Sequence, residues 1–275
     1  MVFMEKVNFI KMHGLGNDFV ILDARTQGFS DLNDISAKLA DRRLGIGCDQ
    51  VIVLENTPKA DVRMGIYNSD GSRAGMCGNA ARCVADIILN EKQADKISIE
   101  IGSRIVSCAC AGEGMVAVDM GEPILPQISS ASPHAGEDNF LLVDVGNPHC
   151  VFFVDDAEHY PVAGVGPMVE SHPMFPDRTN VEFVTVNDRS NVRMRVWERG
   201  CGVTFACGSG ACATGVAAIQ KGYTDRTVTV HMDGGPLTIE WREADNHITM
   251  TGPVAYVFKG EFLLSSDAAR MVGPL

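Results

Sequence analysis

Two cysteines, Cys77 and Cys207, lie in sequence contexts that suit a pair of catalytic residues, one acting as an acid and the other as a base. Each is followed by glycine and by small residues with helical spacing, which predicts that each precedes the first turn of a helix. The unpaired N–H groups of a first turn bind carboxylates and can lower the pKa of a neighbouring thiol. If both thiols face one carbon, one can remove its proton while the other donates a proton to the opposite side. The pattern therefore predicts inversion at a carbon next to a carboxylate, with no metal and no cofactor.

The two cysteines belong to an internal repeat. Their Cys-Gly pairs are 207 − 77 = 130 residues apart, and three further segments repeat at the same distance. The matching segments are Gly16-Asn17 with Gly146-Asn147, Gln50-Val51 with Asn180-Val181, and Tyr67-Asn68 with Trp197-Glu198. A duplicated chain folds into two similar domains, and the copies of one motif can meet in the cleft between them. The repeat thus predicts that the two thiols face a common ligand.

The elements that must position these thiols can be read from the hydrophobic pattern. Alternating runs such as 97–101 and 115–120 predict strands, and helical spacing predicts a central helix from Gly78 to Asn90, a counterpart after Gly208 and a shorter helix near 36–43. We therefore predict an α+β fold of two pseudo-symmetric domains, each a curved, mostly antiparallel sheet around a central helix. The expected domains are 1–125 and 126–261, with the tail 262–275 packed back on the first.

Polar residues recur at the repeat positions near the cysteines. Amide side chains can bind amino and carboxylate groups with fixed geometry, Glu198 can accept an ammonium group, and Arg199 can hold a second carboxylate with its fork. Any single amide could instead serve a local turn, but recurrence at one offset favours a shared site. His149 follows a turn and could adjust the protonation of a nearby thiol. The candidate amides are Asn17, Gln50, Asn68, Asn147 and Asn180.

The composition limits the classes of partner. The chain has 275 residues, a net charge of −12 and no Lys/Arg run. We therefore expect a small-molecule substrate as its partner, and neither nucleic acid nor a membrane. No apolar run approaches the ~20 residues of a membrane span, and the N-terminus lacks a secretion signal. The nine cysteines, an odd number, indicate free thiols in a reducing compartment, which predicts a cytoplasmic protein. No Cys/His set has zinc spacing, so no metal is expected.

A combination of motifs resembles one known family over nearly the whole chain. The motifs are His13-Gly-Leu-Gly-Asn-Asp-Phe19, Gly45-Ile-Gly-Cys-Asp-Gln50, Asn68-Ser-Asp-Gly-Ser72, Cys77-Gly-Asn79, Gly146-Asn-Pro-His149, Arg178-Thr-Asn180, Glu198-Arg-Gly200 and Ala206-Cys-Gly-Ser-Gly-Ala211. Together they resemble the diaminopimelate epimerase family. The resemblance implies a homodimeric epimerase that works without pyridoxal phosphate. It would interconvert LL- and meso-2,6-diaminopimelate, on the route to lysine and peptidoglycan precursors.

The resemblance also implies a role for each motif residue. Cys77 and Cys207 would be the acid/base pair, with His149 and Glu198 in supporting roles. The reacting carboxylate would be held by Gly78, Asn79, Gly208 and Ser209. The rest of the substrate would be bound by Asn17, Gln50, Asn68, Asn147, Asn180, Glu198 and Arg199.

The sequence departs from the family pattern at a few positions. Ser209 stands where the family usually has threonine, which keeps the hydroxyl group. Cys48 and Cys201 stand where a cysteine is not usual, and both lie close in sequence to site residues. Oxidation could therefore join either of them to the wrong partner.

Two other functions remain open from the sequence. One is another cofactor-independent racemase of the same fold, acting on proline or hydroxyproline. Against it, Glu198-Arg199 and the amides offer more polar groups than a compact imino acid needs. The other is a non-catalytic protein that binds amino acids or senses thiol oxidation, which would bind the ligand without exchanging its α-proton.

Overall fold

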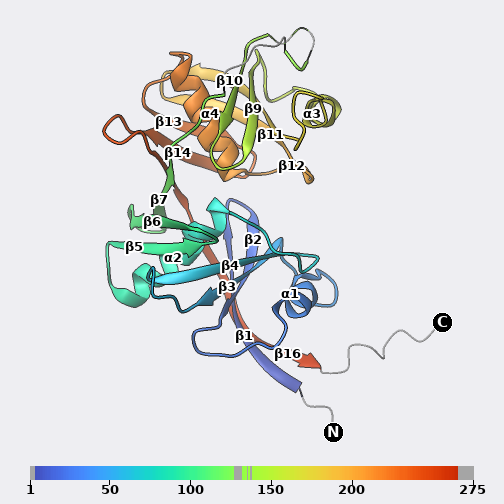
Figure 1. The fold of residues 1–275 in the computed structure, drawn as a ribbon, viewed down its shortest axis with the longest axis vertical. Coiled ribbons are helices and arrows are strands. Elements are labelled where there is room, and N and C mark those ends of the chain that lie inside the picture. Colours follow the sequence, from blue (N-terminus) through green and yellow to red (C-terminus); the bar gives the residue numbers. More distant parts are fainter. Residues whose placement is uncertain (1–3, 127–131, 135, 137, 266–275) are drawn as a thin grey trace, which may run out of the picture.

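The computed structural model describes residues 4–126, 132–134, 136 and 138–265. In it, two sheet-rich halves are stacked along the long axis of the molecule (Figure 1). The elements of the N-terminal half are β1 (Met4–Gly14), β2 (Asn17–Asp23), α1 (Leu32–Ala40), β3 (Gln50–Glu55), β4 (Val62–Asn68), α2 (Gly78–Lys92), β5 (Lys96–Ile101), β6 (Arg104–Cys110) and β7 (Met115–Gly121).

The C-terminal half repeats this order. Its elements are β8 (Phe140–Asp144), β9 (Pro148–Phe153), α3 (Val162–Glu170), β10 (Asn180–Asp188), β11 (Asn191–Glu198), β12 (Gly202–Thr204), α4 (Gly208–Gln220), β13 (Thr227–Met232), β14 (Gly235–Trp241) and β15 (Ile248–Pro253). The last strand is β16 (Ala255–Ser265). No helix in the described part of the chain is long and apolar enough to cross a membrane.

The strands of both halves form one continuous hydrogen-bonded path. Their order is β16-β1-β2-β3-β4-β5-β6-β7-β15-β14-β13-β11-β10-β9-β8, and β12 pairs with β11 at its side. The antiparallel pair of β7 and β15 joins the two halves. Parallel pairs occur at equivalent places, β2 with β3 and β4 with β5 in one half, β9 with β10 and β11 with β13 in the other. The other neighbours are antiparallel, so the predicted α+β fold is confirmed.

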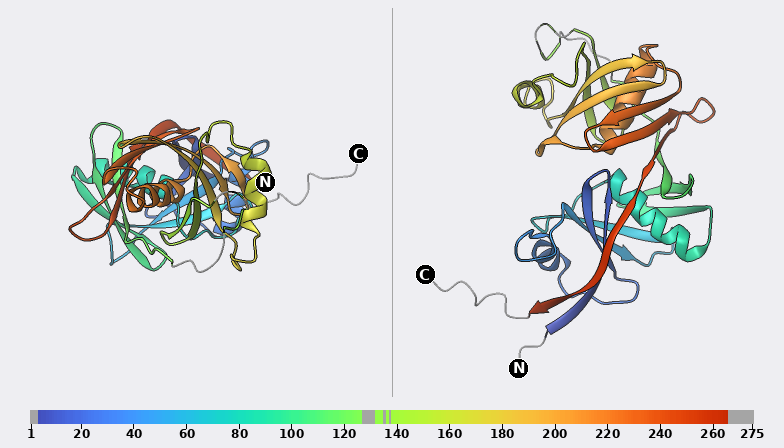
Figure 2. Two further views of the ribbon diagram at one scale, coloured as in Figure 1. Left: turned by 90° about the horizontal axis from the view of Figure 1, so that it is seen from above. Right: turned by 180° about the vertical axis from the view of Figure 1, so that it is seen from behind.

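The last strand returns to the N-terminal half. β16 pairs with β1 in antiparallel fashion from His13 opposite Ala255 to Met4 opposite Ser265. Figure 2 shows β16 running down the back of the molecule beside β1. This pairing begins before the tail expected at 262–275, of which 266–275 lies outside the described residues. The division into domains at residue 125 stays a prediction.

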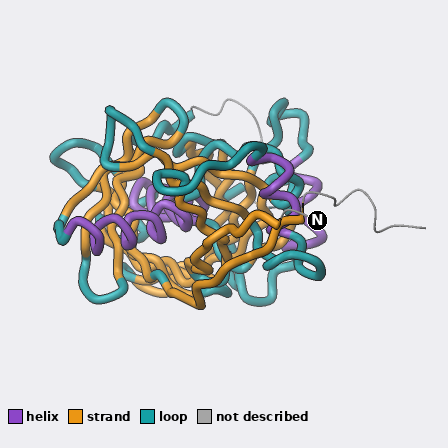
Figure 3. Tube along the Cα trace, turned by 90° about the horizontal axis from the view of Figure 1, so that it is seen from below, coloured by secondary structure: helices purple, strands orange, loops and turns teal. Residues whose placement is uncertain are grey.

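The central helices α2 and α4 are enclosed by curved strands (Figure 3). One continuous apolar core surrounds them and includes Ile88 of α2 and Val216 of α4. The all-apolar centre of β3 is buried on both faces: Ile52 belongs to this core, whereas Val53 packs with Leu39 of α1. α3 covers β10 in the same way, with its own small core. The strands β3 and β10 are therefore covered on both sides, which explains their unbroken apolar runs.

The helix boundaries follow from their caps. α2 begins at Gly78, as predicted, because Cys77 has an extended backbone and its side chain accepts from the helix. It ends where Gln93 adopts a left-handed conformation with φ 50°. The short helix was expected near 36–43 but spans Leu32–Ala40, because the Asp31 side chain accepts from the first-turn N–H groups and fixes an earlier start.

Candidate active site

The two candidate thiols have equivalent geometry in the two halves. Cys77 is the N-cap of α2 and its Sγ accepts from the N–H of Ala80 at 3.5 Å. Cys207 is the N-cap of α4 and its Sγ accepts from the N–H of Gly210 at 3.4 Å. Both residues have extended backbones, with φ −143° and −125°. The internal repeat thus places one thiol at the start of each central helix.

Met250 of β15 brings these two helix starts together. A Cβ atom at Gly78 would lie 2.8 Å from Met250 Cε, and one at Gly208 would lie 3.2 Å from Met250 Sδ. A Cβ at Gly208 would also lie 3.6 Å from Oδ1 of Asn79, which belongs to the other half. A side chain at either glycine would therefore displace the Met250 side chain. The first turns therefore meet at one place, as the duplication predicted.

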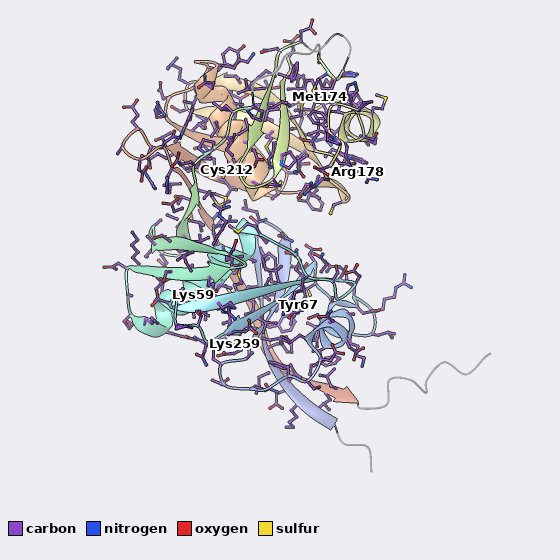
Figure 4. The ribbon with its side chains drawn as sticks, in the orientation of Figure 1. Lys59, Tyr67, Met174, Arg178, Cys212 and Lys259 are labelled. Atoms are coloured by element: carbon purple, nitrogen blue, oxygen red, sulfur yellow. The ribbon has the colours of Figure 1, made fainter. Side chains whose placement is uncertain are left out.

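These first turns are suited to an anion. Neither α2 nor α4 carries an acidic residue in its first turn. The unpaired N–H groups and the positive end of each helix dipole therefore have no negative side chain of their own helix beside them. Two helix N-termini that converge in this way form a carboxylate-binding arrangement. Figure 4 shows the side chains that the two halves direct toward each other at this junction.

A hydrogen-bonded chain fixes the Cys77 side of the site. Asn17 Oδ1 accepts from Cys77 Sγ at 3.6 Å and from Asn79 Nδ2 at 3.2 Å. Asn17 Nδ2 donates to Asp49 Oδ2 at 2.9 Å, and Asp49 in turn accepts from Arg42 at 2.7 Å. The carboxylate sets the orientation of the Asn17 amide, so its oxygen faces the thiol. Asp49 was not among the predicted site residues, although it lies in the Gly45–Gln50 motif.

A second chain fixes the Cys207 side. Ser209 Oγ lies 3.5 Å from Cys207 Sγ and accepts from Asn147 Nδ2 at 3.3 Å. Asn147 Oδ1 is 3.2 Å from Nε2 of the buried His149, and His149 Nδ1 is 2.7 Å from Glu182 Oε1. His149 therefore reaches the thiol through Asn147 and Ser209 rather than by direct contact.

Glu182 on β10 is a buried carboxyl group that the sequence reasoning missed. Its side chain is fully buried, and Oε2 has no hydrogen-bond partner among the described residues. A Cβ at Gly210 would lie 2.8 Å from Glu182 Oε1 and 3.3 Å from Cys207 Sγ, so the carboxyl group lies directly behind the thiol. Burial raises the pKa of Glu182. The signal that could have revealed it is one acidic residue inside the apolar run 181–184.

The other predicted residues form two hydrogen-bonded pairs, one in each half. Gln50 Nε2 donates to Asn68 Oδ1 at 3.1 Å, where β3 and β4 pair. At the equivalent place in the other half, Asn180 Oδ1 accepts from the backbone N–H of Arg199 at 3.0 Å. Glu198 accepts from the Thr204 hydroxyl. Among the described residues, these pairs bond to one another and to their neighbours rather than to the thiols.

Burial dominates the electrostatics of both thiols. It raises the pKa of Cys77 to about 11, against the lowering effect of the Ala80 N–H. It raises the pKa of Cys207 well above its usual value. The negative charge of Glu198 adds to the rise of the pKa at both thiols. The net direction is opposite to the lowering expected from helix termini alone, because desolvation of a thiolate outweighs the helix amides.

The buried thiols should make the protein less stable at alkaline pH. Burial raises the pKa of Cys83 and of Cys212 to about 12, from the usual 9.0. Above the unfolded value the folded state keeps protons that the unfolded chain loses, so the free energy of unfolding falls as pH rises. We expect a loss of about 1.4 kcal/mol per thiol by pH 10. Melting temperatures at pH 8 and pH 10 test this, and Cys83→Ala should show the smaller drop; an equal drop would contradict the prediction.

The two unusual cysteines differ in environment. Cys48 is buried, and burial raises its pKa to about 11. Cys201 is exposed, in the turn that follows Glu198. All nine cysteines are free thiols. Among the described residues, no group of three or more His, Cys, Asp or Glu side chains is placed to hold a metal ion.

The duplicated fold places the protein in a structural class of two-domain proteins whose solved members include an epimerase and a phenazine biosynthesis protein. Hydroxyproline epimerase from Agrobacterium vitis aligns with a TM-score of 0.71 at 14% identity, over 97% of this chain and 94% of its own. A PhzF-family phenazine biosynthesis protein from Bacillus anthracis aligns with a TM-score of 0.74 at 15% identity, over 95% of this chain and 100% of its own. At such identities the likeness shows the fold alone.

Sequence similarity narrows this class to one family. The family model described as diaminopimelate epimerase matches residues 9–126 and 141–257. A relative from Methanococcus maripaludis (strain C6), named diaminopimelate epimerase, is 46% identical and aligns over 93% of this chain and 99% of its own. A relative of the same name from Rhodospirillum centenum is 47% identical and aligns over 92% of this chain and 91% of its own. The chain belongs to the diaminopimelate epimerase family.

Proposed function

We propose that this protein epimerises LL-2,6-diaminopimelate to meso-2,6-diaminopimelate, with Cys77 and Cys207 as its acid and base. Membership of the family supports the substrate. The observation that carries the reaction type is that the two thiols cap equivalent helices whose first turns meet at Met250. Lysine and peptidoglycan precursor synthesis would use the product.

The reaction follows from where charge appears. The substrate's α-carboxylate lies between the two helix N-termini, held by the region of Gly78, Asn79, Gly208 and Ser209. One thiolate takes the α-proton as the C–H bond breaks, and the electron pair moves onto the carboxylate to form an enediolate. The first-turn N–H groups stabilise that charge. The opposite thiol then protonates the carbon on its other face. The substrate thus loses one proton to the first sulfur and gains one from the second, and no cofactor is required.

Burial makes the ionised form of each thiol unfavourable, so a nearby positive charge is needed to stabilise the thiolate. The substrate's α-ammonium group brings one positive charge into the site and is expected to favour thiolate formation. We assign the remaining substrate contacts to the polar residues around the thiols. These are Asn17, Gln50, Asn68, Asn147, Asn180, Glu198 and Arg199, with His149 and Glu198 supporting the acid/base pair.

We further propose that the enzyme is a cytoplasmic homodimer, as the family resemblance implies. A site that depends on two free thiols works only where disulfides do not form, and all nine cysteines are free. Sedimentation of the purified chain would test the dimer.

Proton NMR in deuterium oxide tests the reaction. The reduced protein is incubated with LL-diaminopimelate, and the α-proton signal and the meso isomer are followed. Loss of the signal together with inversion supports the proposal. No exchange with diaminopimelate, but exchange with proline or hydroxyproline, would favour the other racemase. Binding without exchange of any of these would favour a binding or thiol-sensing protein.

Replacing Arg199 with lysine should weaken substrate binding. Arg199 is exposed, and its Nη1 donates to the backbone oxygen of Asp177 at 3.1 Å, which holds the guanidinium in place. Lysine cannot form the bidentate pair with a carboxylate, so KM should rise roughly tenfold with a smaller change in kcat. Arg189→Lys, which alters an exposed arginine paired with Asp225, is the control. An unchanged KM would remove Arg199 from the site.

A further inference from the structure

Arg82 on α2 carries a buried charge that the reaction as described does not use. Its side chain has 0% exposure, and its guanidinium lies in a slot between β1 and β15. A Cβ at Gly14 would lie 2.9 Å from Arg82 Nη2, and one at Gly252 would lie 3.2 Å from Arg82 Nε. Glycine at these two positions leaves the room that the guanidinium occupies.

No carboxylate within the described ranges pairs with this guanidinium. It donates to Asn79 Oδ1 at 2.9 Å and to Pro253 O at 3.4 Å, and it contacts Met250 Sδ at 3.6 Å. A buried cation without an anionic partner is normally strongly unfavourable. A permanent positive charge is nevertheless useful where a negative charge forms during a reaction.

The ionisable groups around Arg82 are thiols. The thiols whose ionised forms would interact with the Arg82 charge are Cys77, Cys83 and Cys212. Cys77 caps α2 and Cys83 lies within it, whereas Cys212 comes from α4 in the other half, where Figure 4 labels it. Of these, only Cys77 stands at a helix N-terminus.

Arg82 also determines how the Cys77 side of the site is oriented. Because it donates to Oδ1 of Asn79, the Nδ2 of that amide is turned toward Asn17. Asn17 Oδ1 then faces both Asn79 Nδ2 and the Cys77 Sγ. The guanidinium therefore acts on Cys77 through two amides as well as through its charge.

The charges that face Cys77 have opposite effects. Arg82, from α2, lowers its pKa, and Glu198, from β11, raises it. The α-ammonium of a substrate is present only while substrate is bound, whereas Arg82 is permanent. It supplies positive charge before the proton transfer and after it.

We propose that Arg82 is a positioning residue for Cys77 that orients Asn79 and supplies the buried positive charge balancing the anion as it passes from the Cys77 thiolate to the substrate carboxylate. It does not touch the reacting atoms. The proposal rests on the proposed two-thiol site, but its first test requires no substrate.

The test measures how readily Cys77 ionises. Iodoacetamide is added to the full-length reduced protein over a range of pH, and alkylation of Cys77 is followed by fragment mass spectrometry of its peptide. The thiolate is the reacting form, so the rate reports its population. In Arg82→Met the midpoint of the rate should move up by more than about one pH unit, a roughly tenfold lower rate at pH 8. Arg82→Lys, which keeps the charge, should recover most of the shift.

Two controls separate charge from folding. Arg25→Met removes a largely buried arginine that pairs with Asp23 and with Glu91 of α2, and it should leave the Cys77 midpoint unchanged. Asn79→Ala removes the orienting amide and keeps the Arg82 charge, so it should shift the midpoint much less than Arg82→Met. Circular dichroism and melting curves show whether each variant folds.

The outcomes distinguish the proposal from a structural role and from the reaction. If Arg82→Met folds and its midpoint equals that of the natural protein, Arg82 does not balance the thiolate. If Arg82→Met does not fold, Arg82→Lys is the deciding variant. A shift of the Cys77 alkylation midpoint by more than about one pH unit in this variant, which keeps the charge, overturns the proposal. The acid limb of the pH profile of kcat/KM should move with the alkylation midpoint. A midpoint shift without diaminopimelate turnover in the natural protein would sustain the role of Arg82 and refute the substrate.

Discussion

The Cys77→Ala and Cys207→Ala variants should each lose epimerisation of diaminopimelate by about 10²–10⁴-fold while remaining folded. The two thiols stand at opposite helix starts, so neither can reach the carbon face served by the other. Without one thiol, the α-proton can be removed but not replaced on the opposite face. Without the other, a proton donor is present but no base removes the α-proton. The measurement is inversion and α-proton exchange by NMR in deuterium oxide.

The chain offers a matched control on each central helix. Cys83 lies in the interior of α2 and Cys212 in the interior of α4, and both are buried. Cys83→Ala and Cys212→Ala remove a thiol from the same helices without altering the N-caps, so both should retain turnover. Substantial inversion by either N-cap variant would exclude the two-thiol mechanism. Loss of activity in all four variants would instead indicate a general effect on folding.

The architecture could be predicted because it is repeated. A constant offset of 130 residues identified equivalent segments, and the structure confirms Gly78 and Gly208 as the first residues of the two central helices. The short helix was predicted too late because Asp31 was not recognised as its cap. A capping side chain four residues before Ile35, the first position of the apolar pattern, is a weak signal beside the pattern itself.

The electrostatics of the site could not be predicted from the sequence. A cysteine before a helix indicates a lowered pKa, but the sequence does not show how deeply the thiol is buried. At Cys77 and Cys207 desolvation is the largest effect and reverses the direction. Arg82 was also missed, because a cation in a helix is normally interpreted as part of its solvated face. Its burial depends on glycines at 14 and 252, which are distant in sequence.

Glu182→Ala should destabilise the protein by about 3–5 kcal/mol, the usual cost of removing one partner of a buried pair. Glu182 and His149 are both fully buried at the side chain and lie 2.7 Å apart. Without the carboxyl group, His149 Nδ1 loses its hydrogen-bond partner, and a cavity opens behind Gly210 and Cys207. Urea unfolding measures the change in the free energy of unfolding. Turnover should also fall, since His149 orients Asn147 and, through it, Ser209.

Comparing the loss of stability in related Glu182 variants separates the contribution of the hydrogen bond from that of the cavity. Glu182→Gln keeps the shape and an oxygen that can accept from His149 Nδ1, so it should lose clearly less stability than Glu182→Ala. If the pair acts as a unit, the double variant Glu182→Ala/His149→Ala should lose less than the two single losses combined. Strict additivity would show that the two side chains stabilise the fold independently. A loss below about 1 kcal/mol in Glu182→Ala would mean that the carboxyl group contributes little to this half of the site, because a buried hydrogen bond to a charged group is typically worth more.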